Sequence, residues 1–161
     1  MKPVIIFHSY SGITRGVAAK VHAACGGDLI EVTPKNAYST LTAYTAGCMR
    51  ARNEDCDPVE PHHIDVASSD ILVIGTPVWA WKASPVINGA VAALENCSGK
   101  KAVIFATCGG KPGETLPILK RKLAEKGVTA AAEIVFNKKE TEDPAKIEAL
   151  ISAVKTAAPA S

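Results

Sequence analysis

The sequence lacks the patterns that mark several common classes of protein. Its five cysteines contain no C-x-x-C pair and lie at wide, irregular spacings, which argues against a zinc site and against a thioredoxin-type redox motif. Free thiols in a reducing compartment explain this spacing better. The formal net charge is only +2 over 161 residues, so nothing in the composition indicates a nucleic-acid partner.

Long hydrophobic runs are also missing. The apolar run near the start, Val4 to Phe7, is too short for the core of a signal peptide and far too short to cross a bilayer, so a buried strand explains it better. Apolar residues make up 47% of the chain and charged residues 21%, an ordinary balance for a globular protein. We therefore expect a cytoplasmic protein with no membrane partner. The length predicts a single domain over residues 1–157, followed by a short tail at 158–161.

What the chain does contain is a regular alternation of strand-like and helix-like segments. Strands are predicted at Val4–His8, Leu29–Val32, Ile71–Ile74, Lys101–Ala106 and Ala130–Phe136. Helices are predicted at Ile13–Cys25, Pro85–Leu94, Glu114–Lys126 and Pro144–Lys155. A further helical face lies between the second and third strands and comprises Leu41, Tyr44, Cys48 and Met49. This alternation predicts right-handed crossovers and a parallel α/β sheet.

In such a sheet, ligands bind outside the carboxyl ends of the strands, at the point where the strand order reverses. The loops after the first, third and fourth strands are therefore the candidate site. They are also the loops with the most unusual composition, since they hold both tryptophans and several of the glycines and hydroxyl side chains.

The loop after the first strand has the composition of a phosphate-binding loop. It comprises Ser9, Tyr10, Ser11, Gly12, Ile13 and Thr14, and a helix follows at once. Unpaired N–H groups and the positive end of the dipole favour an anion at the start of a helix, and the hydroxyls can donate further hydrogen bonds. The loop contains no lysine, which excludes a P-loop and predicts a phosphate monoester held by neutral donors. The alternative is that these hydroxyls merely cap the helix.

This loop resembles the phosphate loop of the flavodoxin family, [ST]-x-[ST]-G-x-T. Ser9, Ser11, Gly12 and Thr14 match every fixed position, and the order of elements is similar over essentially the whole chain. The segment Tyr38–Asp55 also looks like the helical segment of one flavodoxin-like subgroup. The resemblance implies a short-chain, three-layer α/β sandwich with a five-stranded parallel sheet in the order 2-1-3-4-5 and helices on both faces. It also implies FMN as cofactor.

Two further loops are candidates for contact with the flavin ring. Both tryptophans lie within three residues after the third strand, and a planar ring there can stack on an isoalloxazine. The resemblance implies that Trp79 flanks the flavin, with Trp81 as the second candidate, although either could instead pack in the core. The predicted contacts in this loop are Thr76, Pro77, Val78, Trp79, Ala80 and Trp81.

After the fourth strand, the resemblance implies that a glycine-rich loop receives the pyrimidine edge of the flavin through its backbone groups. A flexible turn is the alternative. The predicted contacts here are Thr107, Cys108, Gly109, Gly110 and Gly113. No catalytic residue and no metal ligand is predicted.

These observations favour an FMN-binding electron-transfer protein that works with a reductase and an electron acceptor, as a monomer or homodimer. Two features differ from typical carriers: the chain is slightly basic, and Ala80 replaces the glycine that often follows the aromatic residue. The alternative is an FMN-dependent NAD(P)H oxidoreductase of the quinone-reductase type. A flavin-free receiver domain ranks last, because the first strand ends in His8-Ser9 where such domains need an acidic cluster.

Overall fold

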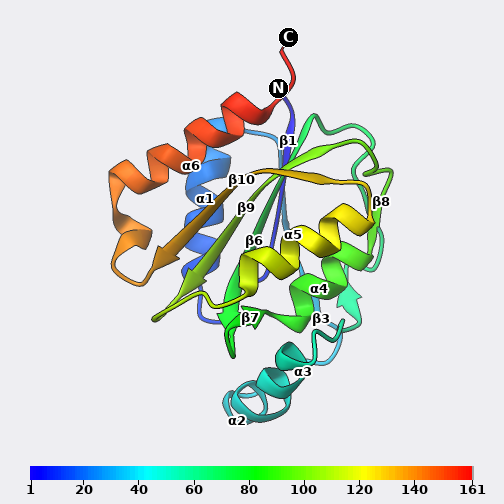
Figure 1. Ribbon diagram of the computed structural model, residues 1–161, viewed down its shortest axis with the longest axis vertical. Helices are drawn as coiled ribbons and strands as arrows, with labels where there is room; N and C mark the ends of the chain where they lie inside the picture. Colours follow the sequence, from blue (N-terminus) through cyan, green and yellow to red (C-terminus); the bar gives the residue numbers. More distant parts are fainter. Residues whose placement is uncertain (161) are drawn as a thin grey trace.

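Five parallel strands form the central sheet of the computed structural model, which describes residues 1–160 (Figure 1). Across the sheet they lie in the order β2 (Asp28–Glu31), β1 (Pro3–Phe7), β6 (Ile71–Trp79), β9 (Lys101–Cys108) and β10 (Thr129–Asn137). This order confirms the predicted arrangement. The chain starts at β1, moves outward to β2 and then crosses back to β6, so the strand order reverses beside β1.

Alternating side chains of the strands build two cores, one on each face of the sheet. Ile5 and Phe7 pack on the face covered by α1 (Ile13–Cys25) and α6 (Pro144–Ala157). Val4 and Ile6 point the other way, and α4 (Pro85–Ala92) and α5 (Thr115–Glu125) cover that face. Figure 1 shows the two helical layers on either side of the sheet. Every residue of β1 is buried, which explains its continuous apolar sequence.

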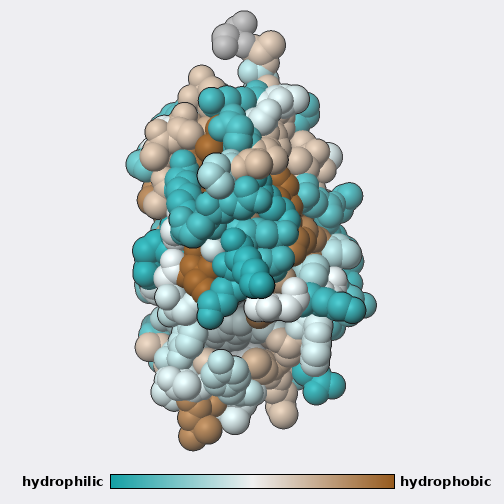
Figure 2. All heavy atoms as spheres, turned by 90° about the vertical axis from the view of Figure 1, so that its left-hand side faces the viewer, coloured by the Kyte–Doolittle hydropathy of each residue, from teal (hydrophilic) through white to brown (hydrophobic). Residues whose placement is uncertain are grey.

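The surface on the α1 and α6 side is mostly hydrophilic, with hydrophobic residues in separate patches (Figure 2). Among residues 1–160, every helix is too short or too polar to traverse a lipid bilayer. Helix α6 ends at Ala157, one residue before the predicted tail at 158–161; the last residue of that tail, Ser161, lies outside the described residues.

The polar stretch between β2 and β6 contains the predicted helix in three consecutive parts: α2 (Thr40–Thr42), the π-helical η1 (Ala43–Gly47) and α3 (Cys48–Arg52). We call residues 40–52 the helical flap. Most of its predicted apolar face is exposed rather than buried in the core. In Figure 1 the flap projects at the end of the molecule where the central strands terminate.

Asp57 fastens the helical flap to the body of the protein. Its carboxylate accepts a hydrogen bond from the Tyr38 hydroxyl, just before the flap, and from Arg50 Nε at 2.7 Å, near its end. The Asp57 carboxylate is buried, whereas the Arg50 side chain that pairs with it is 40% exposed. A single side chain therefore connects the segment before the flap to the last turn of the flap.

The third strand of the prediction, β6, is longer than the sequence indicates. It continues past Ile74 to Trp79, because Pro77 pairs with β9 and the last two residues pair with β7 (Lys82–Ala83) in a hairpin. The two turn residues, Ala80 and Trp81, have φ angles of 49° and 64°. Such two-residue turns usually contain asparagine or glycine, so this turn is strained.

The remaining elements are short. Two two-stranded pairings lie outside the main sheet, and one 3-10 turn precedes α6. They are β3 (Thr33–Pro34) with β4 (Val59–Glu60), β5 (Ile64–Asp65) with β8 (Leu94–Glu95), and η2 (Glu140–Glu142).

Gly75 in the centre of β6 is required for packing. A Cβ there would lie 2.2 Å from Cζ of the fully buried Phe105. We expect Gly75→Ala to lower the free energy of unfolding by about 1–3 kcal/mol, measured by chemical denaturation. The same substitution at Gly16, which faces open space in α1, should raise it by about 0.5–1 kcal/mol. A Gly75→Ala variant as stable as the wild type would contradict this packing.

Candidate functional site

A cavity of about 330 Å³ opens at the carboxyl edge of the sheet, beside the point where the strand order reverses. Residues from all three predicted loops line it: Tyr10, Ser11, Ile13, Thr14, Pro77, Val78, Trp79, Ala80, Thr107, Cys108 and Gly109. Residues that the sequence analysis did not single out as site residues complete the lining, namely Ala43, Tyr44, Cys48 and Lys138. The volume falls within the range of small-molecule sites.

One end of the cavity is formed by the start of α1. The N-cap of this helix is Gly12, at φ +93°, which has no side chain with which to cap it. Its N–H donates to Ser9 Oγ at 3.0 Å, so the hydroxyl closes the loop and leaves the first turn of the helix uncapped. The alternative in which these hydroxyls cap α1 is therefore wrong. N–H groups left free at a helix start attract an anion.

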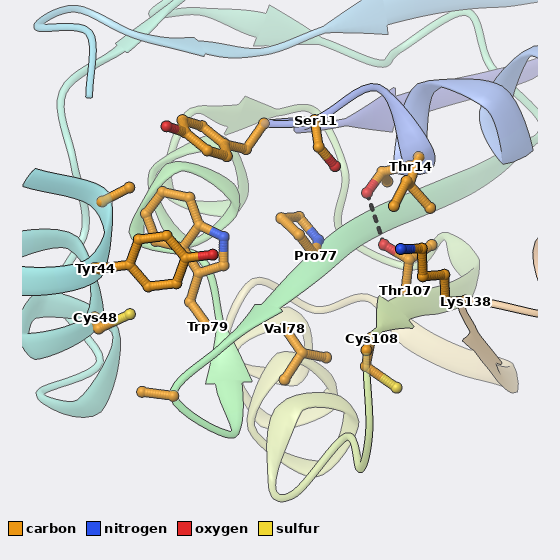
Figure 3. Close-up of a pocket in the computed structure, with 15 residues that line it drawn as sticks. Ser11, Thr14, Tyr44, Cys48, Pro77, Val78, Trp79, Thr107, Cys108 and Lys138 are labelled. Atoms are coloured by element: carbon orange, nitrogen blue, oxygen red, sulfur yellow. Dashed lines mark hydrogen bonds between the residues drawn. The ribbon is translucent and has the colours of Figure 1, made fainter. Parts of the chain in front are cut away.

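Thr14 and Thr107 join this end of the cavity to the sheet. Their hydroxyl oxygens lie 2.8 Å apart, and both side chains are buried (Figure 3). Since Thr107 belongs to β9 and Thr14 to the first turn of α1, the hydrogen bond fixes the helix start over the end of that strand.

The other end of the cavity is aromatic. The indole of Trp79 is only 9% exposed, and three rings meet it edge-on with centroids 5.2–5.9 Å away, those of His8, Tyr10 and Tyr38. The helical flap packs on it too, because a Cβ on Gly47 would lie 2.8 Å from the indole. Trp79 thus packs as a core residue and also lines the cavity. Figure 3 shows Tyr44 on the same side of the cavity.

Several predicted site residues lie behind or beside the cavity. Thr76 is fully buried, where its hydroxyl donates to the Pro77 carbonyl at 2.8 Å and accepts from Ser84 N–H at 3.2 Å. Trp81 is 66% exposed at the tip of the hairpin. A Cβ on Gly113 would lie 2.4 Å from Trp81 Cβ, so that glycine accommodates the hairpin. The remaining predicted residues outside the lining are Ser9, Gly12 and Gly110, which adjoin lining residues along the chain.

The lining residues that were not predicted come from two places. Tyr44 and Cys48 belong to the apolar helical face that the sequence shows, but their position over the cavity depends on how the flap docks. Lys138 follows β10, whose last residue, Asn137, pairs with Cys108. Once the strand order is known, this register brings Lys138 close to the glycine-rich loop.

Two buried titratable groups near the cavity, His8 and Cys108, are held neutral. Burial lowers the pKa of His8 to about 4, although the charges of Glu31 and Asp57 act in the opposite direction. The Nδ1 atom of His8 lies 2.9 Å from the Ser84 hydroxyl. Burial likewise raises the pKa of the Cys108 thiol, which donates to the Gly110 carbonyl at 3.2 Å. Cys108 is therefore a neutral neighbour of the site rather than a thiolate.

Comparisons with known proteins agree with this architecture. The sequence model of the flavodoxin family matches residues 2–144. A search of curated proteins found no match.

Among solved structures, a provisionally named flavoprotein from Bacteroides eggerthii is 24% identical, with a TM-score of 0.75 over 96% of this chain and 98% of its own. A flavoprotein from Lactobacillus acidophilus, solved with FMN, is 19% identical, with a TM-score of 0.71 over 90% of this chain and 99% of its own. Megasphaera elsdenii flavodoxin is 19% identical, with a TM-score of 0.62 over 96% and 99%. At these identities the similarity shows the fold.

The buried, neutral state of His8 makes stability depend on pH. The His8 imidazole takes up a proton near pH 6.5 in the unfolded chain but only near pH 4 in the folded chain. The contribution of neutral His8 to the free energy of unfolding is therefore complete above pH 6.5 and is lost as the pH falls toward 4. Between pH 7 and pH 5 the loss is about 2 kcal/mol. We expect His8→Asn to remove this part of the dependence in denaturation curves, and the same substitution at exposed His62 to retain it. Equal slopes for wild type and His8→Asn would contradict the assignment.

Proposed function

The chain belongs to the flavodoxin family, and we propose that it is an FMN-binding carrier that passes electrons between larger redox proteins. The observation that carries the proposal is the cavity at the carboxyl edge, which has an anion-attracting end and an aromatic end. FMN has the same division, with a phosphate at one end and a planar ring at the other. The Lactobacillus flavoprotein with a similar fold was solved with FMN.

The residues at the anion-attracting end of the cavity fit a phosphate monoester. The uncapped start of α1 supplies backbone N–H groups, and Ser11 and Thr14 add hydroxyls that line the cavity. The Thr14 and Thr107 hydroxyls are hydrogen-bonded to each other, which uses the proton of only one of them. The hydroxyl that accepts in this pair can still donate its own proton to a ligand. We propose that residues 9–14 hold the phosphate, as the flavodoxin pattern implies.

The residues at the aromatic end of the cavity fit a flat aromatic ring. Trp79 and Tyr44 provide aromatic surface, and Pro77 and Val78 provide apolar surface along β6. Because the Trp79 indole is fixed by the rings around it, it can orient a bound ring without a large loss of side-chain entropy. The backbone at Cys108 and Gly109 is placed to meet a polar edge. We propose Thr76, Ala80, Trp81, Gly110 and Gly113 as supporting or contacting residues of these loops.

FMN, when bound, would supply the exchange of one or two electrons. The chain's own contribution is to hold the ring between apolar surfaces and to keep the buried groups beside it, His8 and Cys108, uncharged. An apolar setting of this kind disfavours added negative charge on the ring and so lowers its reduction potential.

A cluster of exposed apolar side chains near the cavity supports a carrier. Leu41, Tyr44 and Met49 on the helical flap are 65–75% exposed, and Trp81 at the hairpin tip is 66% exposed. Clusters of exposed apolar residues commonly mark surfaces that contact another protein. A partner docked here would lie beside the ring edge, where electrons can cross over a short distance. We propose that the reductase and the electron acceptor use this surface in turn.

Anaerobic reduction of the FMN-loaded protein distinguishes a carrier from an enzyme. A carrier needs a protein partner, so we expect dithionite to bleach the flavin absorption and NAD(P)H to leave it unchanged over the same period. Rapid bleaching by NADH or NADPH would instead establish an FMN-dependent NAD(P)H oxidoreductase. A protein that cannot be loaded with FMN would refute both functions.

A substitution at Tyr44 tests whether the aromatic end binds the flavin ring, and it leaves the core intact because the Tyr44 side chain is 75% exposed. We expect Tyr44→Ala to weaken binding of both FMN and riboflavin by about 3–10-fold, from the loss of one stacking surface. Fluorescence quenching of the flavin measures both affinities. The control is Leu41→Ala, which removes an exposed apolar side chain from the same flap outside the cavity lining. Equal losses in the two variants would show that Tyr44 has no specific contact.

A further inference from the structure

Lys138 brings a positive charge to a cavity that the sequence predicts to bind phosphate through neutral donors alone. It lines the cavity together with Ser11, Thr14 and Thr107. Figure 3 shows it at the end where the Thr14–Thr107 hydrogen bond lies, away from Trp79 and Tyr44. The ammonium group therefore belongs to the anion-attracting end of the site.

The backbone around Lys138 is fixed by a tight turn. The Asn137 side-chain oxygen accepts from the N–H groups of Lys139 and Glu140, at 3.0 and 3.2 Å. The Lys138 carbonyl accepts from the Thr141 hydroxyl at 3.1 Å. The start of the Lys138 side chain is thus positioned before any ligand arrives, which lowers the entropy lost on binding.

Two other charged groups near this end of the cavity, Arg15 and Glu140, are already paired. The Arg15 guanidinium lies beside the phosphate loop, but its Nε donates to Glu31 at 3.0 Å. Glu140, the carboxylate closest to Lys138 in the chain, forms an ion pair with Lys146 at 2.8 Å and accepts from Asn137 N–H. Within residues 1–160, Lys138 itself has no carboxylate within ion-pair distance. Its charge is available for a ligand.

We propose that Lys138 binds the phosphate of FMN and sets the preference of this site for FMN over riboflavin; this inference rests on the proposed function. A phosphate monoester carries close to two negative charges at neutral pH, and an ammonium group adds to the helix dipole and the hydroxyl donors in stabilising them. The site would then combine neutral donors from the loop between β1 and α1 with one cation from the turn after the outermost strand, β10.

The experiment compares FMN and riboflavin affinities, by flavin fluorescence quenching, in the wild type, Lys138→Gln and Lys138→Arg. Riboflavin has the same ring and lacks the phosphate, so it reports on the ring-binding end alone. The control is Lys139→Gln, which makes the same charge change one residue away, on an exposed side chain outside the lining. Repeating the titrations at low and high salt tests the ionic character of the contact.

We expect Lys138→Gln to weaken FMN binding by about tenfold and to leave riboflavin binding unchanged. Lys138→Arg should restore most of the FMN affinity, and Lys139→Gln should match the wild type. Salt should weaken FMN binding less in Lys138→Gln than in the wild type. Unchanged FMN affinity in Lys138→Gln, or an equal loss for both flavins, would overturn the inference while the proposed function stands. A wild-type protein that binds riboflavin and FMN equally would also overturn it, and one that binds neither would refute the proposed function as well.

Discussion

Edge-on packing of three aromatic rings around Trp79 connects the parts of the chain that form the cavity. His8 directly follows β1, Tyr10 lies in the loop between β1 and α1, and Tyr38 lies just before the helical flap. Contacts of this type contribute about 0.5–1.5 kcal/mol each beyond the burial of surface. A helical segment as short as the flap is not stable alone, so docking on Trp79, together with the buried Asp57, holds it over the cavity.

The charge distribution of the cavity follows from the topology. Parallel strands bring their carboxyl ends to one edge, and β1, β6 and β9 are neighbours there. The start of α1 and the turn after β10 supply positive electrostatic potential at one end. At the other end, burial keeps His8 neutral. A ligand with an anionic head and a flat apolar body is therefore complementary to the site along its whole length.

The sequence predicts the central sheet well, because each strand is a run of apolar residues bounded by turn residues. It also places the loop Ser9–Thr14 directly before a helix and at the carboxyl edge of the sheet, where the structure has it lining the cavity. The extension of β6 to Trp79 was not predicted, because it depends on pairing with β9 and β7 rather than on local composition. The contributions of Tyr44 and Lys138 were missed for a similar reason: only the docking of the flap and the register of β10 bring them to the cavity.

The π-helical middle of the flap takes up one additional residue within a single turn. A π-helical turn corresponds to an α-helix that contains one additional residue. Because the wider turn absorbs that residue, losing one residue from Ala43–Gly47 would leave the parts of the helix on either side in nearly the same orientation. Tyr44 and Cys48 are four residues apart, a spacing that places two side chains on one face of a helix, and both line the cavity. A related chain that is one residue shorter in this segment would therefore keep the docking of the flap on Trp79, with the change confined to the turn itself.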